Sequence, residues 1–161
     1  MSSGSFGLKS DGNAVGQFNV HLQFTPAYRR DVFWDEVVKE CCAQAARELA
    51  ARLGLGVAAS EFGPDHWHVF LTGCKAFSAE QLAFRFKGFT SRVVRAQCGA
   101  RIKAKLWGDK FWSEGYFYES VGRVTNESIH HYITQCQGKH WVKQVEPVAV
   151  VSGVQSKLGA F

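Results

Sequence analysis

The sequence predicts an α+β domain with a ferredoxin-like β-α-β-β-α-β order: an antiparallel sheet with helices on one face, plus an extra C-terminal helix. Three observations support this fold class. Residues 17–24 alternate apolar and polar side chains, which is typical of a strand. Two long segments, 31–53 and 78–97, repeat apolar residues at helical spacing. Two short apolar runs, 55–62 and 66–72, lie between them as the strands of a hairpin would.

The first strand and the first helix are each defined by one apolar face. Because side chains alternate along a strand, one face of residues 17–24 collects Phe18, Val20, Leu22 and Phe24. We therefore expect this strand to be half-buried. The helix over 31–53 is expected to stop at Gly54, since glycine commonly follows the last residue of a helix.

The second half of the domain begins at the turn signal of residues 63–65, Gly-Pro-Asp, which separates the two strands of the hairpin. Ser78 and Gln81 have the spacing of a capping box, so the second long helix should begin there and run to about Gln97. The aromatic-rich segment 111–120 predicts a further strand.

A short helix is predicted next, capped by Thr125 or Asn126 and ending near Gln137. The Ser- and Gly-rich residues 1–15 are expected to form a disordered tail. The folded domain is thus expected over 16–140, and residues 141–161 form a C-terminal tail that could add a strand or a dimer contact.

Composition narrows the class of protein. No apolar run approaches the roughly 20 residues that span a bilayer, and the N-terminus has no secretory signal pattern. The five cysteines are odd in number and include no C-x-x-C pair, so reduced thiols are expected. These features predict a cytoplasmic protein without a membrane segment.

The net charge of +5 arises in one stretch, residues 81–108, which has no acidic residue. Its basic residues are Arg85, Lys87, Arg92, Arg95, Arg101, Lys103 and Lys105. A concentrated positive field attracts polyanions, nucleic acid above all. We take Arg85, Lys87, Arg92 and Arg95 as candidate nucleic-acid contacts; the alternative is a solvated basic helix face.

His66-Trp67-His68 is the most pointed local motif. On a strand, both imidazoles lie on one face and Trp67 on the other, an arrangement that can chelate a divalent cation. The alternative is that the two histidines only occupy a partly wet face. Tyr132 is the candidate nucleophile, because a tyrosine hydroxyl can attack a phosphodiester that a metal polarises. Its spacing from Ile129 also allows a buried, structural tyrosine.

Four segments together resemble a known family. Residues 65–71, DHWHVFL, are similar to the His-hydrophobic-His motif of the HUH nucleases. Residues 86–92 (FKGFTSR), 111–122 (FWSEGYFYESVG) and 127–133 (ESIHHYI) resemble the basic helix, the following strand and the tyrosine helix of their single-tyrosine transposases. The resemblance covers about residues 17–140. It is to the small single-strand DNA transposases of the 200/605 insertion-sequence group and, more distantly, to the REP-associated tyrosine transposases.

The resemblance implies a specific activity. His66 and His68 would hold Mg²⁺ or Mn²⁺, and Tyr132, on the extra C-terminal helix, would attack DNA and leave a 5′-phosphotyrosine and a free 3′-hydroxyl. The substrate would be single-stranded DNA with hairpin ends. The protein would be a homodimer whose active sites are shared between subunits.

One position departs from the family pattern. The family usually supplies a glutamine one turn after the tyrosine as a third metal ligand, where this chain has Cys136 between Gln135 and Gln137. The third ligand and the preferred metal stay open at this stage. Two alternatives also stay open: a non-catalytic module that binds single-stranded nucleic acid, and a host-adapted endonuclease that cuts hairpins without moving an element.

Overall fold

The fold is described by a computed structural model, which covers residues 8–106, 108–123 and 125–137. Its sheet has four antiparallel strands in the order β4-β5-β3-β6. The strands are β3 (Asn19–Phe24), β4 (Gly56–Gly63), β5 (His66–Thr72) and β6 (Phe117–Val121). The prediction of a ferredoxin-like antiparallel sheet is confirmed.

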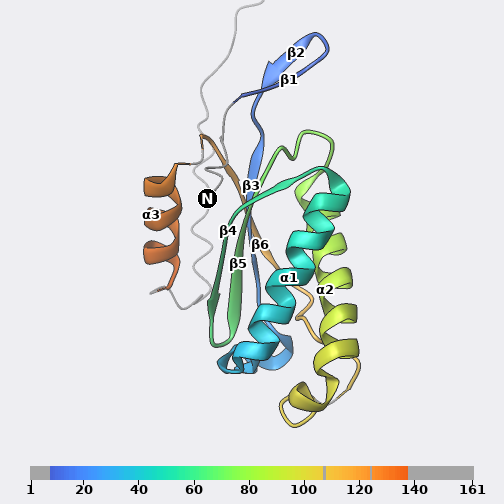
Figure 1. Ribbon diagram of the computed structural model, residues 1–161. Helices are drawn as coiled ribbons and strands as arrows, with labels where there is room; N and C mark the ends of the chain where they lie inside the picture. Colours follow the sequence, from blue (N-terminus) through green and yellow to red (C-terminus); the bar gives the residue numbers. More distant parts are fainter. Residues whose placement is uncertain (1–7, 107, 124, 138–161) are drawn as a thin grey trace, which may run out of the picture.

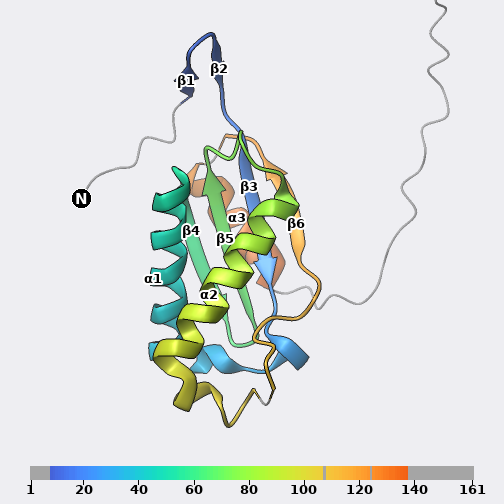
Figure 2. The same ribbon diagram turned by 90° about the vertical axis from the view of Figure 1, so that its right-hand side faces the viewer.

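Three helices flank the sheet. Helices α1 (Glu36–Leu53) and α2 (Ala79–Ile102) cover one face, and α3 (Asn126–Gln137) lies against the other (Figures 1 and 2). Among the helices that the structure describes, none is both long and apolar enough to cross a membrane. The sheet therefore has a thick, two-helix side and a side on which one short helix packs.

The main core fills the space between the sheet and the two long helices. Apolar side chains of β3 and β5 point into it, among them the fully buried Leu22, Phe24, Trp67 and Leu71. Burial of this much apolar surface is the dominant favourable contribution to folding. As a result, β5 is anchored from behind by the side chains that alternate with its histidines.

The N-terminal ends of the two long helices follow local sequence rules. The Ser78–Gln81 capping box is present, with Gln81 N donating to Ser78 Oγ at 3.1 Å. Helix α1 begins later than predicted, at Glu36, because the Asp35 side chain caps it by accepting hydrogen bonds from the backbone N–H groups of Val37 and Val38. Residues 32–34 form a 3₁₀ turn instead of the expected first turn of this helix.

Three further predictions differ from the structure. Residues 9–15, expected in a disordered tail, form with Gly16 a small hairpin of β1 (Lys9–Asp11) and β2 (Ala14–Gly16). Helix α2 passes Gln97 and ends at Ile102, because Cys98 and Ile102 still face the core. The strand expected over 111–120 is confined to its C-terminal part, since Phe111 and Trp112 leave the sheet and pack into the core. The C-terminal tail, 141–161, lies outside the described residues.

Strand β3 is buried on both faces, whereas the sequence predicted a half-buried strand. Its second face carries Asn19, His21 and Gln23, which are 1%, 0% and 7% exposed. This face is covered because β3 lies between β5 and β6 and under α3: the His21 ring lies against His68, Phe70 and Phe117 of the two neighbouring strands. A polar face in the middle of the sheet brings these side chains next to the predicted histidine pair.

Candidate active site

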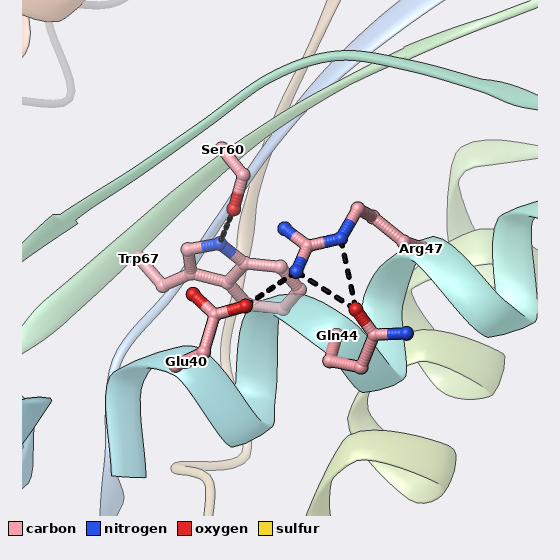
Figure 3. A network of polar contacts seen from close by, with 5 residues as sticks. All are labelled: Glu40, Gln44, Arg47, Ser60 and Trp67. Atoms are coloured by element: carbon pink, nitrogen blue, oxygen red, sulfur yellow. Dashed lines mark hydrogen bonds and ion pairs between the residues drawn. The ribbon is translucent and has the colours of Figure 1, made fainter. Parts of the chain in front are cut away.

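Strand β5 presents the two predicted histidines on the face that α1 and α2 do not cover. Trp67, between them, is fully buried in the core on the opposite face, and its indole Nε1 donates to Ser60 Oγ on β4 at 2.8 Å. Figure 3 shows this contact, together with the network that Glu40, Gln44 and Arg47 form on α1. The hydrogen bond and the core packing fix Trp67, so they also fix the backbone that carries both imidazoles.

Each of the two histidines forms a hydrogen bond through one ring nitrogen, while the other ring nitrogen has no partner among the described residues. His66 Nδ1 lies 2.9 Å from Asp65 Oδ1, and His68 Nδ1 lies 2.9 Å from His21 Nε2. The Nε2 atoms of His66 and His68 are buried, and neither has a hydrogen-bond partner in the described part of the chain. The two rings are 5.1 Å apart, centroid to centroid, and nearly perpendicular.

Burial keeps the inner imidazoles neutral. It lowers the pKa of His21 to about 4 and that of His68 to about 3, with the charges of the neighbouring histidines adding to the effect at His68. Burial alone would raise the pKa of Asp65, but the hydrogen bond from His66 and the charge of Arg29 make the net shift downward. The site thus combines neutral imidazoles with an ionised carboxylate.

The partners of the two Nδ1 atoms set the tautomers. A carboxylate can only accept, so His66 donates Nδ1–H to Asp65 and its Nε2 keeps a lone pair. If His68 donates Nδ1–H to His21 Nε2, its own Nε2 also keeps a lone pair. Two buried lone pairs on one sheet face, each oriented by an outer partner, match the way histidines bind a divalent metal. The two histidines therefore fit a metal site.

A third conventional ligand does not join them among the described residues, since no group of three His, Cys, Asp or Glu side chains is placed to hold a metal there. The sequence candidates Gln135, Cys136 and Gln137 belong to α3, but their side chains lie outside the described residues.

Helix α3, which carries Tyr132, packs on the histidine side of the sheet. Ile129 forms a small apolar cluster with Phe70 of β5 and Val121 of β6. Phe70 stacks in turn on His21, with 4.2 Å between the centroids. Figure 1 shows α3 antiparallel to β5, so that its C-terminal half lies towards the β4–β5 turn. The helix places the backbone of Tyr132 three residues after Ile129; its side chain lies outside the described residues.

The basic residues predicted to contact nucleic acid lie elsewhere. They belong to α2, on the sheet face opposite the histidines. Arg85 and Arg92 are exposed. Lys87 instead holds a loop, because its Nζ donates to the carbonyls of Ser113 at 2.6 Å and Glu114 at 2.8 Å. The neighbouring Arg101 and Lys105 of the same basic stretch form ion pairs with Asp35 and Asp31.

An open groove of about 520 Å³ runs between α2 and the segment 109–116. Its lining mixes cationic and aromatic side chains, including Arg92, Arg95, Lys110, Trp112 and Tyr116. The Nε and Nη2 atoms of Arg95 are buried and have no hydrogen-bond partner among the described residues. A guanidinium placed in this way can donate hydrogen bonds to a phosphate or carboxylate ligand.

Sequence reasoning missed two polar residues of the site, His21 and Gln23. Both alternate with the apolar residues of the first strand, so the pattern put them on the face expected to be exposed. The signal that could have found them is the position of the strand. In a sheet of this order the first strand is an inner strand, next to the strand that carries His66 and His68. A histidine on its polar face is therefore placed beside those two residues.

The family model, the curated relatives and the solved structure that this chain resembles are all described as transposases. The sequence model of the family described as "Transposase IS200 like" matches residues 14–136. The chain is 29% identical to the ISDra2 transposase TnpA of Deinococcus radiodurans over 126 residues, which cover 78% of this chain and 89% of that protein. It is also 29% identical to the transposase for insertion sequence element IS200 of Salmonella typhimurium, over 70% of this chain and 72% of that protein. A solved structure from D. radiodurans R1, described as a transposase, superposes with a TM-score of 0.63 and 26% identity. The alignment covers 79% of this chain and 96% of that one.

Proposed function

The chain belongs to the family of IS200-like transposases, and we propose that it cuts and rejoins single-stranded DNA at hairpin-marked element ends through a 5′-phosphotyrosine intermediate. The observation that carries the proposal is the pair of buried Nε2 atoms of His66 and His68, which have no partner in the described part of the chain. Two oriented imidazoles on the α3 side of the sheet suit a metal-dependent phosphoryl transfer.

The metal is Mg²⁺ or Mn²⁺, with His66 and His68 as protein ligands. When bound, it supplies Lewis acidity that polarises the scissile phosphate. Mn²⁺ accepts imidazole nitrogen more readily than Mg²⁺, which prefers oxygen. Asp65 and His21 act behind the ligands, because each holds one imidazole in the required tautomer.

Tyr132 is the nucleophile. Its hydroxyl oxygen forms a bond to phosphorus while the bond from phosphorus to the 3′ oxygen breaks. Tyr132 loses its proton and the departing 3′ oxygen takes one up. The products are a 5′-phosphotyrosyl link and a free 3′-hydroxyl, so the phosphodiester energy is kept and a second 3′-hydroxyl can reverse the step.

The groove between α2 and segment 109–116 is the proposed site for the duplex part of a hairpin or for flanking single strand. Arg92 and Arg95 would contact phosphates, and Trp112 and Tyr116 offer aromatic surfaces for bases. Because the groove is lined by α2, which covers the sheet face opposite the histidines, binding and cleavage should be separable by mutation.

The test uses labelled single-stranded DNA with candidate hairpin ends, Mn²⁺ or Mg²⁺, and denaturing gels. We expect a slow-migrating covalent protein–DNA species that disappears with EDTA and with Tyr132→Phe, while hairpin binding by Tyr132→Phe is retained. Cleavage by Tyr132→Phe at the parent rate would rule out this nucleophile.

The other candidate, a non-catalytic module for single-stranded nucleic acid, is favoured by one observation: the cationic, aromatic groove lies away from the histidines. It predicts tight binding that survives chelator, without any covalent product. A host-adapted endonuclease would form the adduct but would not join the released ends, so the rejoining step distinguishes it from a transposase.

A further inference from the structure

A buried amide oxygen lies beside the histidine pair and has no assigned role. Gln23, on β3, is 7% exposed, and its Oε1 has no hydrogen-bond partner in the described residues. Buried polar atoms are normally satisfied, because desolvation without a new partner costs free energy. An unpartnered amide oxygen in the middle of a sheet therefore points to a ligand.

The strand register places Gln23 directly against the site. Gln23 is the β3 partner of His68, and residues paired across antiparallel strands point to the same face. His66 is the diagonal neighbour, and residues in that relation are about 7–8 Å apart, within reach of long side chains. Gln23 and His68 thus form one cross-strand pair, and His66 lies two residues along β5 on the same face. Each has one buried polar atom without a partner in the described structure: Gln23 Oε1, His68 Nε2 and His66 Nε2.

We infer that Gln23 is the third protein ligand of the divalent cation, so that β3 and β5 alone supply an imidazole–imidazole–amide oxygen set. This inference rests on the proposed metal site at His66 and His68. A neutral amide oxygen is a hard ligand, which suits Mg²⁺ and Mn²⁺ and complements the two nitrogens. A set built on two adjacent strands of one sheet binds the metal within a single subunit, without a side chain from α3.

Glu61 is the alternative candidate for the third metal ligand. It is paired with His68 from the other side, on β4, and therefore faces the same way. Its side chain is exposed, however, and no three-residue group of His, Cys, Asp or Glu forms there among the described residues. Gln23 is enclosed by its two neighbouring strands, whereas Glu61 is free to point into solvent.

The test is Mn²⁺ binding to the full chain, followed by the electron paramagnetic resonance signal of free Mn²⁺ and requiring no DNA. Gln23→Met preserves the length and removes the oxygen, so we expect Mn²⁺ affinity to fall by about 10- to 100-fold, the range typical of disturbed metal sites. Gln23→Glu restores an oxygen and adds charge, so its affinity should equal or exceed that of the parent. Glu61→Gln is the matched control from the other neighbouring strand and should leave affinity within about 2-fold.

The outcomes separate this inference from the function on which it rests. If His68→Ala abolishes binding while Gln23→Met and Gln23→Glu both bind like the parent, the histidine site stands and Gln23 is not a ligand. If the parent chain binds no Mn²⁺, both the metal site and the role of Gln23 are overturned. A large loss in Glu61→Gln with none in Gln23→Met would assign the third position to β4. Should Gln23→Met fail to fold, Gln23→Glu decides: an affinity below that of the parent overturns the inference.

Discussion

The imidazole of His66 lies directly over Gly63, its partner across the β4–β5 pairing. A Cβ atom on residue 63 would come within 2.0 Å of His66 Cε1 and 2.5 Å of its Nε2. Glycine is therefore needed here for space, because any side chain would occupy the volume of the ring. Gly63, predicted from the sequence as part of the turn, is thus also what leaves room for the His66 ring.

Gly63→Ala should displace the His66 ring and weaken Mn²⁺ binding by at least about 10-fold, in line with other disturbed metal sites. Gly16→Ala is the control, since no atom lies within 4 Å of a Cβ at that strand glycine. Isothermal titration with Mn²⁺ measures the effect. Equal affinities for the parent and Gly63→Ala would show that the ring adapts without loss.

His21→Phe should lower Mn²⁺ affinity by about 10- to 100-fold, because it removes the acceptor that orients His68 Nδ1. Phe70→Leu serves as the control: it removes the ring stacked on His21 but retains the hydrogen bond between the histidines. The variants are compared by metal titration and by adduct yield. A loss that is equal in both variants would attribute the effect to packing.

Folding stability should fall as the pH drops from 6.5 towards 4. Burial holds the pKa values of His21 and His68 in the folded protein at about 4 and about 3, below the 6.5 of an ordinary histidine, so the unfolded chain takes up protons first. The contribution of these two groups to the free energy of unfolding is therefore fully present above pH 6.5. Below that pH it decreases, by about 1.4 kcal/mol per pH unit for each group. Urea unfolding at several pH values measures the slope. A flat profile between pH 6.5 and 5 would contradict the neutral, buried pair.

Arg95→Gln should weaken hairpin DNA binding and reduce the slope of log affinity against log salt by about 1, because one phosphate contact is lost. Adduct formation at saturating DNA should be retained, since Arg95 lies on the sheet face opposite the histidines. Arg47→Gln on α1, which pairs with Glu40, is the control cation and should leave the slope unchanged. Filter binding at several salt concentrations distinguishes the two.

A mixture of Tyr132→Phe and His68→Ala should regain cleavage activity if subunits share active sites. Neither variant alone has both the nucleophile and the full metal site, but a mixed dimer contains one complete set when the tyrosine acts on the partner's histidines. The readout is covalent adduct after co-refolding of the two chains. An inactive mixture that forms mixed dimers would place the tyrosine and the histidines of one site in the same subunit.

Much of this fold could be predicted from local sequence patterns for helix capping and strand alternation. The capping box at Ser78 is visible as two residues, and the alternation around Trp67 assigned both histidines to one face because strand geometry has a period of two. The family resemblance rested on four short segments of this kind, and three of them lie in the elements where they were expected. The fourth, 111–122, enters its strand only at Phe117.

Other features depend on tertiary contacts that no local pattern contains. Phe111 and Trp112 have the composition of a strand, yet they pack edge to face in the core while Lys87 holds the carbonyls that follow them. The polar face of β3 was read as exposed because alternation indicates two faces without indicating what covers the second one. The contribution of His21 and Gln23 followed only once the strand order was known.

The central strand has a further consequence for how the chain finds its native pairing. Val20, Leu22 and Phe24 enter the core while Asn19, His21 and Gln23 face the other way. Sliding β3 by one residue would exchange the two sets, driving an imidazole and two amides into the apolar core and stranding aromatic surface outside it. A pairing of β3 shifted by one residue is thus destabilised twice, by buried polar groups on one face and by exposed apolar surface on the other. His21 and Gln23, which are proposed for the chemistry, therefore also specify the pairing register of β3. Replacing them by apolar side chains should remove the penalty on a register shifted by one residue.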